Sequence, residues 1–211
     1  MEKSVLTVFS PNESEKIIEK SRFLSYCAHV ESEQEARDFI AKIRAKHTLA
    51  AHVCYAFIAD KTGNLQRFSD DGEPQGTAGV PMLEVLKVKK LFETAVAVVR
   101  YFGGVKLGAG GLVRAYSSCV AENLDTADVR ALEVCVEYLL SVDYTGVDRL
   151  QKYLSSNTCS LLSTDYGEKV QIKVAVKKTE EKTFLSALID CMQGRVETER
   201  GGEYYAPFRL T

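Results

Sequence analysis

The chain has 211 residues, which is enough for one large domain or two ordinary ones. Hydrophobic residues make up 45% of it and charged residues 27%, a composition that excludes a disordered or low-complexity polypeptide. The formal net charge of −2 excludes a generally basic nucleic-acid coat protein, although this sum does not report local clusters of charge.

The six cysteines lie at irregular spacings and form no CxxC pair, a pattern typical of neither a zinc site nor a compact disulfide framework. The sequence has no signal-peptide core and no apolar run of about 18 residues. We therefore expect a cytoplasmic protein with reduced, mostly buried cysteines, no membrane contact, no metal site and no cofactor.

The first half of the chain alternates strand-like and helical patterns. A capping box at Ser32 and Glu35 predicts one helix, and Pro81 is a fitting first residue for a short second helix that ends at Leu86. A third helix is expected to bury Leu112, Val113, Tyr116, Cys119 and Val120. Strands are expected at residues 4–9, 15–18, 22–30, 52–59, 65–68 and 94–102. We interpret this half as an α+β domain in which helices cover one face of a sheet.

The C-terminal third has the order strand, helix, strand, strand, helix, strand. Apolar and polar residues alternate from Val170 to Val176, which predicts a hairpin strand with one solvent-exposed face. Gly194 ends a helix whose apolar stripe begins at Phe184, and another helix follows Thr145. The other strands are expected at about 133–142, 158–164 and 195–200. This βαββαβ order is that of a ferredoxin-like fold, so we place the domains at residues 1–132 and 133–211.

Residues 100–116 (RYFGGVKLGAGGLVRAY) lead from an apolar strand through a glycine-rich turn into a helix. The glycines are Gly103, Gly104, Gly108, Gly110 and Gly111. Glycine permits positive φ angles and the close approach of a phosphate, and free amides at a helix start attract anions. With Arg100, Lys106 and Arg114 as the positive charges, the segment predicts an anion or nucleic-acid site. The alternative, that the glycines only allow tight packing of the helix on the sheet, stays open.

The common nucleotide-binding motifs do not fit this segment. Ala109 and Gly110 stand where a P-loop needs Lys and Ser or Thr, and Val113 stands where a dinucleotide fingerprint needs its third glycine. Residues 84–116 hold six basic and two acidic side chains, so they carry +4 while the rest of the chain carries −6. Such a segment suits phosphate backbones without base specificity, and a solvated helix end with scattered lysines is the alternative.

Residues 69–81 (SDDGEPQGTAGVP) form a second irregular segment. We expect Asp71, Glu73, Gly76 and Thr77 to border the anion site. The acidic residues lack the spacing of an EF-hand, which argues against a metal at this loop. A binding loop and an ordered loop with Thr77 or Asp71 as a cap are the two remaining interpretations.

His52 and Cys54 are further candidates for the site. They occupy alternate positions of one expected strand and so share a face, which is the minimum for an imidazole paired with a thiolate. No orienting third group accompanies them, and the alternative for Cys54 is a small buried hydrophobe.

Three of these segments together resemble the signature of the IMPACT/YigZ family: residues 52–56 (HVCYA), residues 69–81 and residues 99–116. The resemblance covers the whole chain, and from it we expect the two longer segments to meet in space. It implies an N-terminal domain similar to the second domain of a small-subunit ribosomal protein and to domain IV of the translocase elongation factor. It also implies a C-terminal domain similar to the ferredoxin-like domain V of that factor.

The resemblance further implies a link to translation, with RNA or the ribosome as partner. Eukaryotic members of the family restrain an amino-acid-starvation kinase by competing for its activator, and they carry an additional RWD domain. We expect this chain to begin directly with the IMPACT-type domain, so that role is not transferred to it. The leading hypothesis is a translation-associated regulator or binding protein without enzymatic activity. The alternatives are an enzyme acting on a phosphorylated or anionic small molecule and a protein-interaction module.

Overall fold

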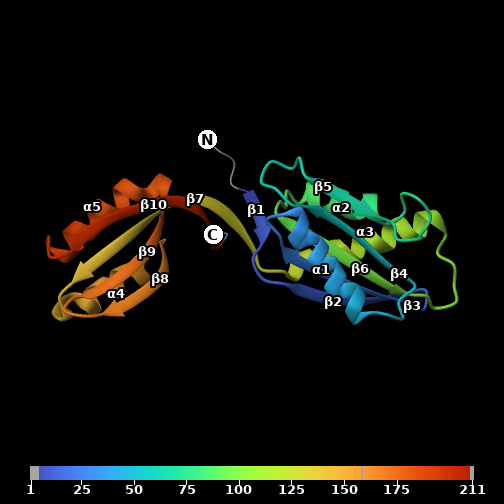
Figure 1. Cartoon of the computed structure of the whole chain (residues 1–211), viewed down its shortest axis with the longest axis horizontal. Coiled ribbons are helices and arrows are strands. Elements are labelled where there is room, and N and C mark those ends of the chain that lie inside the picture. Colours follow the sequence, from blue (N-terminus) through green and yellow to red (C-terminus); the bar gives the residue numbers. More distant parts are fainter. Residues whose placement is uncertain (1–4, 158, 210–211) are drawn as a thin grey trace. The chain divides into compact units, whose positions relative to one another are not determined.

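The computed structural model describes residues 5–157 and 159–209, which fold into two compact units (Figure 1). Unit 1 contains the described residues up to Ala131 together with Arg209, and unit 2 spans Leu132–Phe208. Ser4 and Thr158, each predicted to begin a strand, lie outside the described residues.

Unit 1 is built on a five-stranded antiparallel sheet with the order β2-β3-β6-β4-β5. Its strands are β2 (Asn12–Ile18), β3 (Ser21–His29), β6 (Thr94–Tyr101), β4 (His52–Ile58) and β5 (Gln66–Ser69). A further short strand, β1 (Val5–Val8), is bridged through Leu6 to Leu91. The central strand β6 is buried at seven of its eight residues, as expected of an apolar strand covered on both faces.

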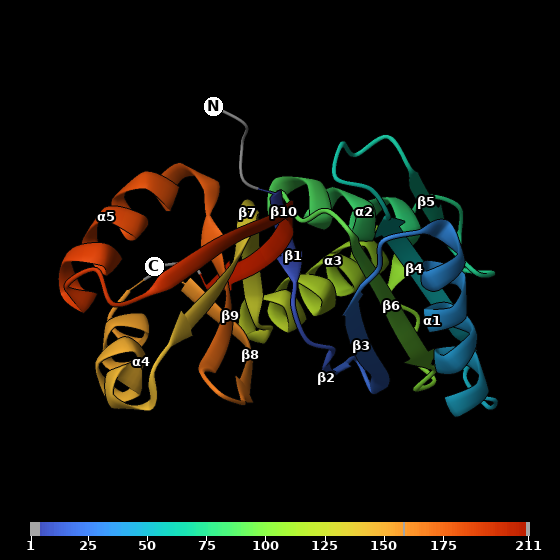
Figure 2. The ribbon, with the colours of Figure 1, turned by 60° about the vertical axis from the view of Figure 1, so that its left-hand side comes forward.

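Helices cover both faces of this sheet (Figure 2). The helices of unit 1 are α1 (Glu33–Lys46), α2 (Gly79–Val88) and α3 (Gly108–Thr126). Ala95 and Ala97 of β6 belong to the apolar clusters under α1, whereas Val96 and Val98 belong to the cluster under α2 and α3. The α+β class is confirmed, but the expectation that helices cover one face is corrected. Both sets of β6 side chains are apolar, so each face needs a cover.

The starts of the helices follow from local hydrogen bonds. Ser32 Oγ accepts from the amide of Glu35 over 3.2 Å, as the capping box predicts for α1. Helix α2 begins at Gly79, two residues before the predicted Pro81, because the Asp70 carboxylate accepts from the amide of Gly79 over 2.8 Å. The predicted burial of Val113 in α3 is wrong. Its side chain is 37% exposed because neighbouring positions of the helix face the sheet.

Unit 2 has the predicted βαββαβ order. Its elements are β7 (Val129–Val142), which begins in unit 1, α4 (Val147–Ser155), β8 (Cys159–Tyr166), β9 (Val170–Lys177), α5 (Glu181–Met192) and β10 (Glu197–Arg209), with 3-10 turns at Tyr144–Gly146 and Lys178–Glu180. The strands are ordered β10-β7-β9-β8, and both helices pack on one face through Leu150, Phe184 and Leu188. This is the ferredoxin-like arrangement.

All six cysteines are free, and four of them are buried, as the sequence predicts. Their burial fits a role as small apolar side chains.

None of the helices in the described part of the chain combines the length and the apolar character that crossing a bilayer requires.

Candidate functional site

The two motif segments meet at a buried ion pair between Arg100 and Glu73. Arg100 Nη1 lies 2.7 Å from Glu73 Oε1, and the two side chains are only 6% and 4% exposed. Tyr116 donates its hydroxyl to the same carboxylate oxygen over 2.8 Å. Burial raises the pKa of Tyr116 far above its usual range, so this hydroxyl keeps its proton. The ion pair therefore joins β6, α3 and the loop of residues 70–78 through one carboxylate.

Arg100 is enclosed on its other sides as well. Its guanidinium lies 5.4 Å from the ring of Phe23 and 5.6 Å from the ring of Phe102, measured to the ring centroids. Ser21 Oγ accepts from Nη2 over 3.4 Å. The sequence-based prediction places Arg100 against an external anion, but in the structure its charge is balanced internally by Glu73. Arg100 therefore belongs to the interior of unit 1 and not to a surface site.

The acidic side chain of Asp71 is held by donors of the protein. Its two carboxylate oxygens accept from the amide of Val53 over 2.7 Å and from Arg44 Nη2 over 2.6 Å. His52 Nδ1 donates to the carbonyl of Asp71 over 2.8 Å, with the ring tautomer assigned from this contact. Thr77, which is buried, donates its hydroxyl to the carbonyl of Pro74 over 2.6 Å. These contacts order the loop of residues 70–78, between β5 and α2.

Cys54 is a buried neutral thiol. Its Sγ donates to the carbonyl of Asp70 over 3.0 Å. Burial raises the pKa of Cys54 to about 12, so the thiolate that nucleophilic catalysis requires is scarce near neutral pH. His52 and Cys54 each contact the loop backbone, which supports the interpretation of Cys54 as a buried small side chain.

The raised pKa of Cys54 predicts a loss of stability in alkali. The protonated Cys54 thiol contributes fully to the free energy of unfolding below the unfolded-state pKa of about 8.5. This contribution is lost as the pH rises toward the folded-state pKa of about 12, because only the unfolded chain then releases the proton. The added slope is at most about 1.4 kcal/mol per pH unit. The test is urea denaturation at a series of pH values between roughly pH 8.5 and pH 11, which lies between these two pKa values. The free energy of unfolding is expected to decline less steeply with pH for Cys54→Ala than for the unaltered protein. Identical slopes would contradict this assignment.

The glycines of residues 100–116 have different structural roles. A Cβ on Gly103 would lie 1.9 Å from the carbonyl oxygen of Lys20, so this glycine allows two backbone segments to pack together. Gly104 and Gly108 have φ angles of +87° and +69°, which other residues rarely adopt. Gly110 and Gly111 lie in the first turn of α3. Close packing of two backbone segments therefore accounts for Gly103, and the anion-site interpretation of the other glycines stays a prediction.

A hollow of about 530 Å³ opens between β2 and the start of α3. Of the predicted site, Lys106, Gly111 and Arg114 line it, and Lys16 of β2 lines it as well. We call this hollow the basic groove; its other lining residues are Ile18, Glu19, Val105, Leu107, Ala115 and Ser118. Within the described ranges, neither Lys106 nor Arg114 forms an ion pair, whereas Lys16 pairs with Glu122.

The structure separates the predicted site into two parts. Asp71, Glu73 and Thr77 belong to the loop contacts described above and are not among the residues that line the basic groove, and Gly76 lines a different hollow between α2 and α3. Lys16 is the groove residue that the sequence analysis missed. It precedes Lys106 by 90 positions, and only the placement of β2 beside α3 brings the two together.

Comparison with known proteins identifies both halves of the chain. Residues 19–124 match the Impact N-terminal domain, and residues 140–195 match a domain of unknown function, DUF1949. The chain is 40% identical to the IMPACT family member YvyE of Bacillus subtilis, covering 94% of this chain and 91% of that protein. It is 35% identical to the IMPACT family member YigZ of Escherichia coli, covering 85% and 89%.

More distant and structural similarities agree with this assignment. A yeast protein named as an IMPACT homolog is 31% identical over 42% of this chain and 35% of its own length. A crystal structure of a hypothetical protein superimposes with a TM-score of 0.62 at 33% identity, covering 94% of this chain and 97% of that one. On these matches, which span both units, the chain belongs to the IMPACT family.

Proposed function

We propose that the chain is a translation-associated binding protein whose basic groove takes the phosphate backbone of RNA, free or in the ribosome. The observation that supports this most directly is the pair of cations, Lys106 and Arg114, which form no ion pair among the described residues and outnumber the one acidic side chain in the hollow, Glu19. Two unpaired charges on one surface attract a polyanion and carry no information about base sequence.

The start of α3 adds to the attraction for phosphate. This helix has 19 residues, with no acidic side chain in its first turn and no side-chain hydrogen bond at its cap. The unpaired amides and the helix dipole at such a terminus favour a negatively charged group. Gly111 lies in this first turn and lines the groove. A phosphate in the groove would therefore meet backbone amides as well as two cationic side chains.

The loop carboxylates favour binding over acid–base catalysis. Glu73 is ion-paired with Arg100, and Asp71 accepts from Val53 and Arg44. A general acid or base must reach a proton of the substrate, whereas Asp71 is occupied by donors of the protein and Glu73 is buried, with its second oxygen 4.0 Å from His52 Nε2. The proposal is therefore a binding protein, in agreement with the translation-linked role that the family resemblance implies.

The test replaces both groove cations in the full chain. Lys106→Ala with Arg114→Ala is expected to weaken binding of a single-stranded RNA roughly tenfold or more at low salt, and to reduce the slope of log affinity against log salt by about 1.4. Fluorescence anisotropy over a series of salt concentrations measures both quantities. Co-sedimentation with ribosomal subunits measures binding to the ribosome.

A matched control removes the same charge from the opposite face of the sheet. Arg37→Ala with Lys42→Ala changes two exposed side chains of α1 and is expected to bind as the unaltered protein does. Equal affinity and an equal salt slope in the groove variant and the control would reject the proposal. Capture of a protein that persists in high salt and after nuclease treatment would point to the interaction-module alternative.

A further inference from the structure

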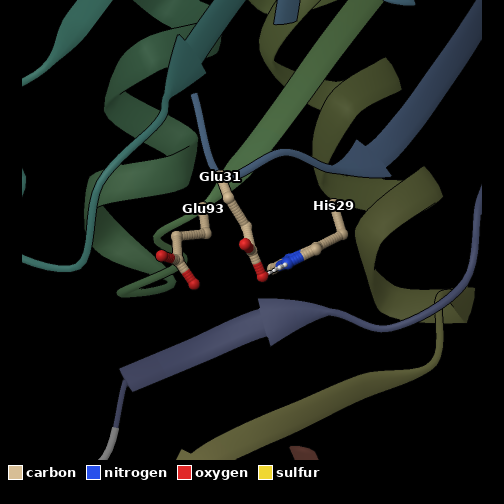
Figure 3. Close-up of side chains that lie close together, drawn as sticks. All are labelled: His29, Glu31 and Glu93. Atoms are coloured by element: carbon tan, nitrogen blue, oxygen red, sulfur yellow. Dashed lines mark hydrogen bonds and ion pairs between the residues drawn. The ribbon is translucent and has the colours of Figure 1, made fainter. Parts of the chain in front are cut away.

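Three side chains that bind divalent metal ions in other proteins meet at one end of the sheet of unit 1 (Figure 3). His29 ends β3, Glu31 follows it by two residues, and Glu93 immediately precedes β6. One imidazole nitrogen and one oxygen from each carboxylate all lie within 4.8 Å of one another. The cluster does not share residues with the basic groove.

Glu93 provides an independent sign that a cation belongs in this cluster. Its side chain is only 6% exposed, and its Oε2 has no hydrogen-bond partner among the described residues. Its other oxygen lies 3.7 Å from Lys61 Nζ. A buried carboxylate oxygen that lacks a donor costs free energy unless a cation completes its environment. Figure 3 shows the side chain of Glu93 beside that of Glu31, which lies between Glu93 and His29.

Thr7 fixes the proton of His29 at the ring nitrogen that faces away from the cluster. The Thr7 hydroxyl donates to the carbonyl of Glu93 over 3.0 Å, so its oxygen accepts from His29 Nδ1 over 2.8 Å. In the neutral imidazole, Nε2 then carries a lone pair and lies 3.1 Å from a carboxylate oxygen of Glu31. Two acceptors this close need a cation between them, which is either a proton or a metal ion.

The spacing of His29 and Glu31 suits a transition metal, and Glu93 Oε lies within 4.8 Å of both, so it would move inward to complete the site. In a tetrahedral site with bonds of about 2.1 Å, neighbouring ligand atoms are about 3.4 Å apart, close to the separation of Nε2 and the Glu31 oxygen. One imidazole nitrogen with two carboxylate oxygens is a donor set for Zn²⁺ and similar ions, whereas Mg²⁺ and Ca²⁺ prefer oxygen alone. The contact between Thr7 and His29 is the kind of outer contact that orients a metal-binding histidine.

We propose that His29, Glu31 and Glu93 form a binding site for a divalent transition metal ion of the Zn²⁺ type. The ion replaces the proton between His29 and Glu31 and supplies a partner for Glu93 Oε2, while Lys61 stays beside the other oxygen. Glu31 is largely exposed, so the ion can enter from solvent on the side of the cluster where Glu31 lies. A water molecule can take a coordination position on that side. The bound ion ties the end of β3 to the residue just before β6, and through Thr7 it also supports β1.

The experiment titrates Zn²⁺ into the full chain in competition with a chromophoric chelator, in a Cys159→Ser/Cys191→Ser background that removes the two less buried thiols. The expected result is one Zn²⁺ per chain, and at least roughly tenfold weaker binding in Glu31→Gln and in Glu93→Gln, which keep the side-chain shape. Thr7→Val is expected to weaken binding roughly 10-fold to 100-fold through loss of the outer contact. Mg²⁺ at the same concentration is expected not to compete.

The exposed position of Glu31 keeps the test informative if Glu93→Gln does not fold. His47→Gln is the matched control, because His47 lies between Tyr26 and Tyr101 and outside the cluster, and it is expected to leave Zn²⁺ affinity unchanged. Co²⁺ as a second probe reports the ligands, since thiolate ligation adds an intense near-ultraviolet band that nitrogen and oxygen ligation lacks. No binding by the unaltered protein, equal binding by Glu31→Gln, or a thiolate band would each overturn the proposal.

Discussion

Glu73→Ala is expected to destabilise unit 1 by about 3 to 5 kcal/mol, because it leaves the guanidinium of Arg100 buried without a counter-charge. Tyr116 would lose its acceptor at the same time. Native-state hydrogen exchange of the β6 amides measures this loss within unit 1, and it does so without depending on unfolding of unit 2. The exchange of β9 amides in unit 2 is expected to stay unchanged.

The double variant Glu73→Met/Arg100→Met separates the ion pair from simple packing. Replacing both charges with apolar side chains removes the uncompensated charge, so the double variant is expected to be clearly more stable than Glu73→Ala. If the double variant were as unstable as the single one, the cost would come from lost packing around the loop, and the account of Arg100 as an internally balanced charge would be wrong.

Gly103→Ala is expected to cost about 3 kcal/mol or more, or to prevent unit 1 from folding. The added Cβ would lie 1.9 Å from the carbonyl oxygen of Lys20 and 2.4 Å from the amide nitrogen of Ser21, and backbone atoms cannot rotate away as a side chain can. The same displacement would break the hydrogen bond from the Gly103 amide to Ser21 Oγ. Urea denaturation followed by circular dichroism measures the change.

Gly110→Ala is the control for this substitution. Gly110 is helical, and a Cβ there meets only Arg114 Nη1, at 3.8 Å. Because alanine is the better helix former, this variant is expected to be as stable as the unaltered protein or up to about 1 kcal/mol more stable. Equal stability of the two variants would show that Lys20 and Ser21 give way easily, contrary to the close packing described above.

The sequence predicts the order of elements in both units because each depends on short-range patterns, but the last strand, expected to end at residue 200, runs from Glu197 to Arg209. The capping box at Ser32, the alternation of Val170 to Val176 and the apolar run of β6 all act within a few residues. The side of the sheet that α1 covers is not a local property. Both faces of β6 are apolar because its run of small and branched residues is continuous. This run shows that each face needs a covering element, but it does not show which helix covers which face.

The candidate site was less predictable because its contacts are long-range. Charge counting treats Arg100 as a surface cation, whereas its partner Glu73 lies 27 positions earlier in a loop whose path sequence does not reveal. Lys16 reaches the basic groove only because β2 lies beside α3. The expectation of no metal site rests on the lack of a motif, and the ligand set proposed above, His29, Glu31 and Glu93, has no characteristic spacing in the sequence.

The hydrogen bonds to the Asp71 carboxylate also affect the rate at which this residue isomerises over time. An aspartate followed by glycine, as in Asp71-Gly72, is prone to cyclise when its side chain turns toward the next amide nitrogen, giving a succinimide and then isoaspartate. In the folded chain, that turn would require the carboxylate to give up both the Val53 amide and the Arg44 guanidinium. The contacts that order the loop thus also protect a chemically fragile dipeptide, and spontaneous isomerisation there would report on opening of the loop.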